Sequence, residues 1–189
     1  MIVSVYGLNG AGKSTALSQI KNQVGFTYVY ESAATKEKQF QNLLLSSLEI
    51  PDKKILKESL SVLIIHRNAF LQYLHSSNRE FMVFQGMCDP AVALCASKVF
   101  KFPILREFKP LSLITQSIYV RCTPVHSYNR YVERQKKGNS AIFWDYPTYY
   151  KWFLALQQLA RTRNSIIVEN NSSYNIFKEC LKSELLKLK

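Results

Sequence analysis

Acidic residues are scarce in this chain of 189 amino acids. Aspartate and glutamate together number 13 against 25 lysines and arginines, so the formal net charge is +12 at pH 7. Such a charge suits phosphate-rich ligands in a cleft, or a nucleic acid on a wider positive surface. Solvated lysines on helix faces, such as Lys182, Lys187 and Lys189, explain it equally well. The net charge therefore bears on which partners the chain binds and does not indicate its fold.

Cysteine, histidine and long apolar runs are also sparse. The four cysteines (Cys88, Cys95, Cys122, Cys180) show no C-x-x-C spacing, and the three histidines (His66, His75, His126) have no metal-ligand spacing with them. We expect reduced, mostly buried thiols and a cytoplasmic location. No apolar run is long enough to cross a bilayer, and residues 1–5 lack the basic segment of a signal peptide, so we expect no membrane contact.

Glycine is scarce as well, but three of the six glycines fall within one short segment. Residues 7–14 read Gly-Leu-Asn-Gly-Ala-Gly-Lys-Ser and match G-x-x-x-x-G-K-[ST], the loop that wraps the phosphates of a nucleoside triphosphate. A β-rich run over residues 2–6 precedes the loop and a helical pattern over 15–20 follows it. A plain glycine turn would explain the glycines but not Lys13 and Ser14.

Each part of this loop has a physical task. The glycines admit positive φ angles and close backbone approach, so successive amide groups can face an anion. The following helix directs its positive N-terminus at the same point. We expect Lys13 to reach the β- and γ-phosphates and the Ser14 hydroxyl to bind Mg²⁺, which makes ATP and Mg²⁺ the predicted cofactors. The predicted nucleotide-binding residues of the loop are Asn9, Gly10, Ala11, Gly12, Lys13, Ser14 and Thr15.

The rest of the chain alternates between β-rich runs and helical patterns. Further strands are predicted over about 26–30, 80–84, 117–121 and 165–169, and helices over about 36–48, 53–75, 89–99, 124–137, 147–161 and 176–188. Strands separated by helices predict one α/β domain over residues 1–189, with a mostly parallel sheet of about five strands and helices on both faces. Ligands bind such sheets at the carboxyl ends of the strands, so residues just after each strand are site candidates.

Two charged residues stand out near the predicted strand ends and helices. Glu31 follows the second strand, where a carboxylate can accept a proton from a substrate hydroxyl that attacks a γ-phosphoryl group. The alternative is a surface glutamate at a strand end. Arg67 lies in an otherwise apolar stretch, where an arginine needs an anionic partner. A substrate group and a structural salt bridge fit that need equally well.

A basic helix follows the fourth predicted strand. Arg130 and Arg134 are one helical turn apart and can point to the same face. A mobile segment over about 124–146 can then fold over the phosphates, neutralise charge on the γ-phosphoryl group and exclude water. A solvated basic helix is the alternative. The aromatic residues within 143–153 could stack on a base, but we expect most of them in the core.

In their order along the chain these features resemble the thymidylate kinase and deoxynucleoside kinase group of P-loop kinases. They are the phosphate loop, Tyr30-Glu31, Arg67 in a long helix, and Tyr119-Val120-Arg121-Cys122-Thr123-Pro124 followed by Arg130, Glu133 and Arg134. The resemblance implies a three-layer P-loop kinase fold with a basic helical lid. It implies Glu31 near the acceptor and Arg67 on the substrate. It also implies Arg130 and Arg134 on the lid, and the loop Asn170-Asn171-Ser172 beside the adenine. The candidate catalytic residues are Lys13, Glu31, Arg130 and Arg134.

The chain departs from these families at the end of the third predicted strand. The families carry an Asp-Arg or Glu-Arg pair there, which serves the metal and the substrate phosphate, whereas this chain has Gln85-Gly86. Gln85 cannot supply a negative charge to the metal, and Asp89 further along is the candidate substitute. Together with Glu31 and Arg67, these two residues are the predicted substrate-binding set.

We therefore expect an ATP-dependent kinase that acts on a hydroxyl or phosphate of a (deoxy)nucleoside or its monophosphate. Two alternatives stay open: a kinase acting on a hydroxyl of a modified base within DNA, and a non-catalytic ATP-binding switch. The Gln85-Gly86 pair counts against the standard monophosphate reaction, and the net charge of +12 suits DNA. The predicted partner is a nucleoside or nucleotide substrate, and the oligomeric state, a homodimer included, stays undecided.

Overall fold

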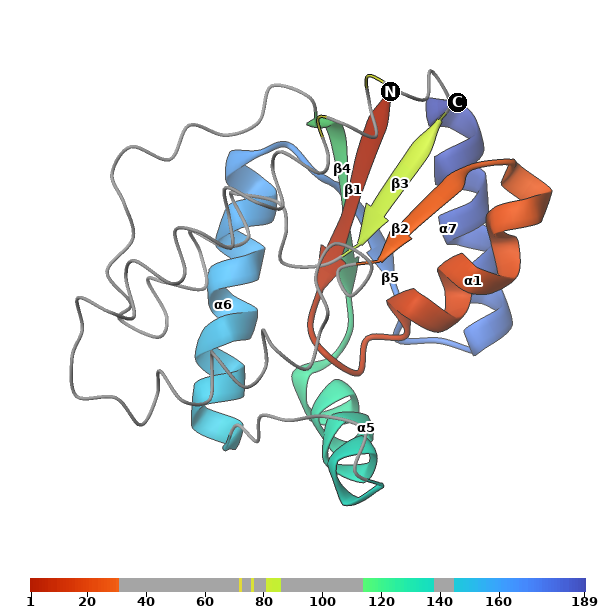
Figure 1. Cartoon of the computed structure of the whole chain (residues 1–189). Helices are drawn as coiled ribbons and strands as arrows, with labels where there is room; N and C mark the ends of the chain where they lie inside the picture. Colours follow the sequence, from red (N-terminus) through yellow and green to blue (C-terminus); the bar gives the residue numbers. More distant parts are fainter. Residues whose placement is uncertain (31–71, 73–75, 77–80, 86–113, 138–144) are drawn as a thin grey trace.

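The computed structural model of the chain describes residues 1–30, 72, 76, 81–85, 114–137 and 145–189 (Figure 1). Its elements, in chain order, are β1 (Ile2–Gly7), α1 (Lys13–Val24), β2 (Thr27–Tyr30), β3 (Met82–Gln85), β4 (Ile114–Arg121), α5 (Pro124–Lys136), α6 (Tyr146–Thr162), β5 (Ile166–Glu169) and α7 (Tyr174–Leu188). The helices expected over 36–48, 53–75 and 89–99 lie outside the described residues, except that residue 72 is helical.

The described strands form one parallel sheet of five, in the order β2-β3-β1-β4-β5. β1 lies at its centre, with Ile2 opposite Met82 of β3 and Gly7 opposite Val120 of β4. β2 pairs with β3, and β5 pairs with β4, both in parallel. The parallel α/β sheet predicted from the alternation of strands and helices is confirmed.

Helices cover both faces of this sheet, and β1 is buried along most of its length. Val3 and Val5 are fully buried and Tyr6 is 1% exposed. α1 and α7 pack side by side on one face, and α6 lies on the opposite face (Figure 1). A parallel strand buried on both faces favours apolar residues, and residues 2–6 are mainly apolar, with Ser4 as the buried polar exception. The three predicted layers are therefore present.

β4 is longer than the sequence pattern predicted. It begins at Ile114 instead of residue 117, because Ile114 pairs with Ile2 across a register irregularity between Ile2 and Val3. Thr115 Oγ1 also donates to the Ile2 carbonyl oxygen at 3.2 Å. Residues 114–116 are less buried and more polar than the run 118–120 that follows, so they give a weaker signal of a buried strand.

The start of α6 and α7 is set by a side chain that caps the first turn. Asp145 Oδ1 accepts from the backbone N of Thr148 at 2.9 Å, and Ser173 Oγ accepts from the backbone N of Ile176 at 3.4 Å. Such caps satisfy amide groups that lack an intrahelical partner. α7 therefore begins at Tyr174, slightly ahead of the prediction. Among the helices of the described ranges, none has the length and apolar character needed to cross a membrane.

Candidate nucleotide-binding site

The segment between β1 and α1 is a tight loop that requires glycine at two positions. Gly10 has a φ of 82° and Gly12 a φ of 83°, both in the left-handed region. A Cβ on Gly10 would lie 2.2 Å from the Ser127 carbonyl oxygen of α5, and one on Gly12 would lie 2.9 Å from Asn170 Nδ2. These positions therefore need glycine for the backbone angle and for the approach of neighbouring elements.

Lys13, the first residue of α1, bends back over the loop. Its Nζ donates to the carbonyl oxygens of Gly7 at 3.0 Å and Leu8 at 2.7 Å, and the residue is only 8% exposed. A buried ammonium group needs such partners. The N-cap residue Gly12 offers no side-chain cap, and the first turn of α1 holds no acidic residue. The helix N-terminus and the ammonium group thus concentrate positive charge at the loop.

Three separate elements hold the outer side of the loop. The carbonyl oxygens of Asn9, Gly10 and Ala11 accept, in that order, from the Tyr149 hydroxyl in α6, from Arg130 Nη1 in α5 at 3.3 Å, and from Asn170 Nδ2 after β5 at 2.8 Å. The N–H and C=O groups of a trans peptide unit point in opposite directions. Anchoring the carbonyls therefore turns the peptide N–H groups of the loop away from these elements.

Two of these anchors, Asn170 and Tyr149, were not predicted to hold the phosphate loop. Asn170, which is 3% exposed, was expected with Asn171 in the loop beside the adenine, and the structure instead places its side chain on the phosphate loop. Tyr149 offered no signal, because its contact arises from the packing of α6. Arg130 and Arg134 lie on α5 as predicted, the first on the loop and the second exposed one turn later. Glu31, Arg67 and Asp89 lie outside the described residues.

Gln85 joins the end of β3 to the first turn of α1. Its Nε2 donates to Ser14 Oγ at 2.8 Å, and its Oε1 accepts from the Tyr28 hydroxyl on β2. The residue that stands where the resembling kinases carry an acid therefore lies directly beside the predicted metal ligand. In the part of the chain that the structure describes, no three His, Cys, Asp or Glu residues cluster as a metal site.

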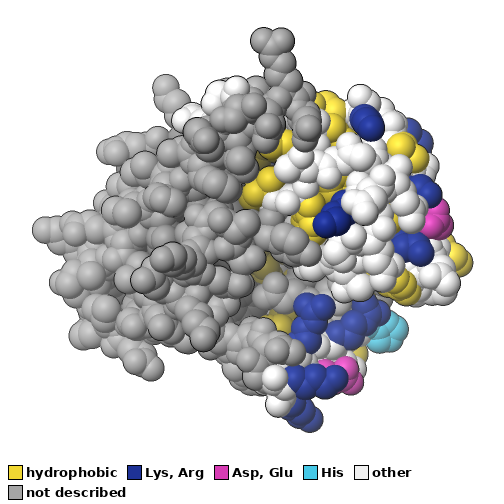
Figure 2. Space-filling view, turned by 45° about the vertical axis from the view of Figure 1, so that its right-hand side comes forward, with side chains coloured by type: hydrophobic (Ala, Val, Ile, Leu, Met, Phe, Trp, Pro, Cys, Tyr) yellow, Lys and Arg dark blue, Asp and Glu magenta, His cyan; other side chains and the backbone are white. Residues whose placement is uncertain are grey.

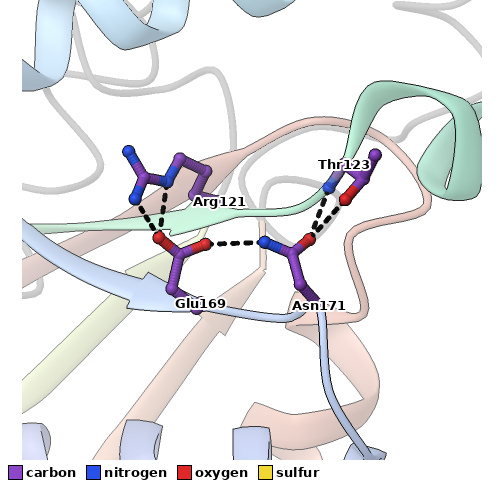
Figure 3. Close-up of polar contacts among 4 residues, drawn as sticks. All are labelled: Arg121, Thr123, Glu169 and Asn171. Carbon is purple, nitrogen blue, oxygen red and sulfur yellow. Dashed lines mark hydrogen bonds and ion pairs between the residues drawn. The ribbon is translucent and has the colours of Figure 1, made fainter.

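A chain of polar contacts links the carboxyl ends of β4 and β5 (Figure 3). Arg121 Nε donates to Glu169 Oε1 at 2.6 Å, and this hydrogen bond raises the pKa of the Arg121 guanidinium. Asn171 Nδ2 donates to Glu169 Oε2 at 2.9 Å, while Asn171 Oδ1 accepts from the backbone N and Oγ1 of Thr123 at 2.7 and 2.8 Å. The predicted adenine-side residue Asn171 thus ties the loop after β5 to the start of α5.

The aromatic residues of α6 pack against α5. Tyr149 stacks on Tyr131 with ring centres 5.6 Å apart, and Tyr128 meets Tyr149 edge-on at 5.1 Å. Tyr149, Trp152 and Phe153 are all buried. The expectation that most of these rings belong to the core is confirmed for the three of them, and the same packing holds Tyr149 against the loop.

Cys122, which follows β4, is expected to be an unreactive thiol. It is 1% exposed, and burial raises its pKa even though Arg130 and Lys13 oppose the shift. The thiolate is the nucleophile, so a raised pKa leaves less of it at neutral pH. Iodoacetamide should label the exposed Cys180 at least about tenfold faster than Cys122, as peptide mass spectrometry can measure. The expectation would be contradicted if iodoacetamide labelled Cys122 and Cys180 at the same rate in the folded protein and also at the same rate in urea.

No protein-family model and no curated protein sequence matches the chain. Solved structures do match it. A deoxyadenosine kinase from M. mycoides with bound dATP has a TM-score of 0.66 at 16% identity, covering 98% of this chain and 99% of that chain. The same enzyme with the products dCMP and a flexible dCDP gives 0.67 at 16% identity, covering 99% and 100%.

A second kind of kinase is also similar. A gluconokinase from Sinorhizobium meliloti 1021 has a TM-score of 0.57 at 14% identity, covering 98% of this chain and 91% of that chain. At such low identity the likeness concerns the fold, and it extends over nearly the whole length of each chain. Together with the parallel sheet and the glycine loop, it shows that this chain has the fold of the P-loop nucleoside and nucleotide kinases.

Proposed function

We propose that the chain is an ATP-dependent phosphotransferase that passes the γ-phosphoryl group to a hydroxyl or phosphate of a (deoxy)nucleoside or its monophosphate. The observation that carries this proposal is the phosphate loop, where an ammonium group, a helix N-terminus and three anchored peptide units meet. Kinases among the similar solved structures support a kinase activity in general. The identity of the acceptor is the part that needs experiment.

On the donor side, Lys13 is assigned to the β- and γ-phosphates. Its Nζ already points over the loop, and exchanging the Gly7 and Leu8 carbonyls for phosphate oxygens gives the ammonium group a charged partner. Arg130, which reaches the Gly10 carbonyl oxygen, is assigned with Arg134 to charge that develops on the transferred group. The loop that holds Asn171 is assigned to the adenine side.

The residues beside the loop also fit Mg²⁺. Hard cations prefer oxygen ligands, and the Ser14 hydroxyl lies at the start of α1 with the Gln85 amide next to it. Ser14 would hold the ion, which when bound supplies positive charge to the β- and γ-phosphate oxygens. Neither side chain is an anion, so the nucleotide itself must bring most of the negative charge that Mg²⁺ requires.

The proposed function is tested by ATP turnover against a panel of acceptors. The panel holds free deoxynucleosides, their monophosphates, and DNA with and without hydroxyl-bearing modified bases. Transfer to a free nucleoside or nucleotide supports the proposal. ATP binding without transfer to any acceptor would favour the switch alternative, and no binding of ATP at all would overturn the assignment of the loop.

Glu31→Gln should slow transfer by about 10²–10⁴-fold while leaving ATP affinity within about twofold, if the carboxylate is the general base. The amide keeps the size of the side chain but accepts no proton from the acceptor hydroxyl. Single-turnover kinetics and ATP titration measure the two effects separately. Comparable losses in ATP affinity and in rate would instead assign Glu31 a structural role.

A polymeric acceptor is the second candidate, because basic side chains are gathered on α5. Arg130, Arg134 and Lys136 of α5 are exposed, as is Lys137 directly after it. Figure 2 shows lysine and arginine side chains clustered in the lower part of the view. Contacts to several phosphates would make binding of DNA fall steeply with salt. Transfer to DNA alone, with a strong salt dependence, would replace the free nucleoside or nucleotide as the acceptor.

A further inference from the structure

We propose that Gln85 is a positioning residue for metal binding, and that it acts by reversing the hydrogen-bond chain Tyr28–Gln85–Ser14. In the structure the Tyr28 hydroxyl donates to Gln85 Oε1, and Gln85 Nε2 donates to Ser14 Oγ at 2.8 Å. The inference rests on the proposed function, since it concerns the Mg²⁺ that accompanies a bound nucleotide.

The row of hydrogen bonds Tyr28–Gln85–Ser14 can run in either direction because both of its end groups are hydroxyls. A hydroxyl donates one hydrogen bond and accepts others, whereas an amide has one donor end and one acceptor end. A half-turn of the Gln85 amide therefore lets Ser14 donate to Oε1 and Nε2 donate to the Tyr28 oxygen. Both directions make the same two hydrogen bonds, so a modest bias at one end selects between them.

A cation at Ser14 supplies that bias. The hydroxyl oxygen gives a lone pair to the cation, and its proton must then point away toward an acceptor. The observed direction presents the NH₂ group of Gln85 to Ser14. These hydrogens carry partial positive charge and compete with the cation for the oxygen. The reversed direction presents Oε1 instead, which accepts the proton and orients the ligand.

Glutamine is the residue type that gives this behaviour. A glutamate at position 85 would accept from both hydroxyls and would hold Ser14 in the metal-binding arrangement permanently, with a full negative charge beside it. A methionine would match the length of glutamine, but its thioether sulfur is only a weak acceptor for the Ser14 proton and cannot donate to Ser14. Metal affinity in this chain is therefore coupled to the orientation of one neutral amide.

The test measures Mg²⁺ affinity in the ADP complex, with no catalytic turnover involved. ADP affinity is first determined in EDTA for every variant, and Mg²⁺ is then titrated calorimetrically into the saturated complexes. Gln85→Met should weaken Mg²⁺ binding about tenfold, and Gln85→Glu should strengthen it about tenfold. The matched control is Gln19→Met, an exposed glutamine on α1, which should change nothing. Gln85→Leu serves as a second apolar variant if Gln85→Met does not fold.

A double-mutant cycle with Ser14→Ala separates this mechanism from a general effect of position 85. Without the Ser14 hydroxyl, Gln85→Met should alter Mg²⁺ affinity less than about twofold, because the two residues act as one unit. In the wild-type ADP complex, nuclear Overhauser contacts of the Gln85 side-chain NH₂ should move from Ser14 to the Tyr28 ring when Mg²⁺ is added.

The outcomes distinguish the two proposals. If the wild type binds ADP and Mg²⁺ but Gln85→Met binds Mg²⁺ equally well, the inference about Gln85 is wrong and the proposed function stands. An equal effect of Gln85→Met with and without Ser14, or NH₂ contacts that stay at Ser14, also overturns it. If the wild type does not bind ADP in EDTA or with Mg²⁺, the proposed function fails, and the inference fails with it.

Discussion

Replacing Lys13 with alanine should slow phosphoryl transfer by about a thousandfold, equivalent to about 4 kcal/mol of transition-state stabilisation. Lys13 is only 8% exposed, and the Gly7 and Leu8 carbonyl oxygens hold its ammonium group over the loop before any phosphate arrives. A fixed charge in a partly dehydrated site stabilises developing negative charge without reorganisation. Single-turnover transfer from ATP, at saturating acceptor, measures the effect.

The matched control is Lys21→Ala, which removes an exposed lysine from the last turn of the same helix. That variant should keep the wild-type rate, because it changes the net charge equally without touching the loop. Lys13→Arg keeps the positive charge, but the planar guanidinium group of arginine does not reproduce the compact ammonium group that lysine carries on a flexible side chain. If Lys13→Ala and Lys21→Ala transfer phosphate equally well, the loop is not the donor site.

Gly10→Ala should damage both the stability of the fold and nucleotide binding. The new Cβ would stand 2.2 Å from the Ser127 carbonyl oxygen, and α5 would have to move to relieve the clash. The left-handed φ of 82° adds strain for any residue with a Cβ. We expect a loss of about 3 kcal/mol or more in the free energy of unfolding, and loss of the stabilisation that ADP confers.

Gly25→Ala separates backbone strain from the clash. Gly25 also has a left-handed φ, of 71°, but its Cβ would meet only the flexible end of Lys189 at 3.0 Å. This variant should lose about 1 kcal/mol and should keep its response to ADP. Urea unfolding with and without ADP compares the two. Equal costs at the two glycines would mean that the approach of α5 to the loop contributes nothing.

Much of the fold could be predicted because its signals are local. The β-rich run over residues 2–6 predicts a buried strand, and β1 is such a strand. The alternation of strands and helices predicts a parallel sheet, which is present. Boundaries were less accurate where a distant partner sets them, as for β4, whose first residue pairs with Ile2. The helices expected over 36–48, 53–75 and 89–99 remain predictions.

The candidate site divides in the same way. The phosphate loop and the basic helix with Arg130 follow from residue types at short spacing. The contacts of Gln85 did not follow, although its departure from the expected acid was visible, because Tyr28 and Ser14 meet it only through the order β2-β3-β1. Asn171 was expected beside the adenine, and the structure adds its bonds to Thr123 and Glu169.

The amino-acid sequence by itself determined where a triphosphate can be held, because the glycines, the lysine and the strand and helix around them are consecutive. Only the tertiary structure decided how the loop is kept in shape. Its three carbonyl anchors come from residues 120, 140 and 159 positions away along the chain. No periodicity or spacing spans such separations, since these contacts exist only once the sheet has brought α5, α6 and the end of β5 around the loop.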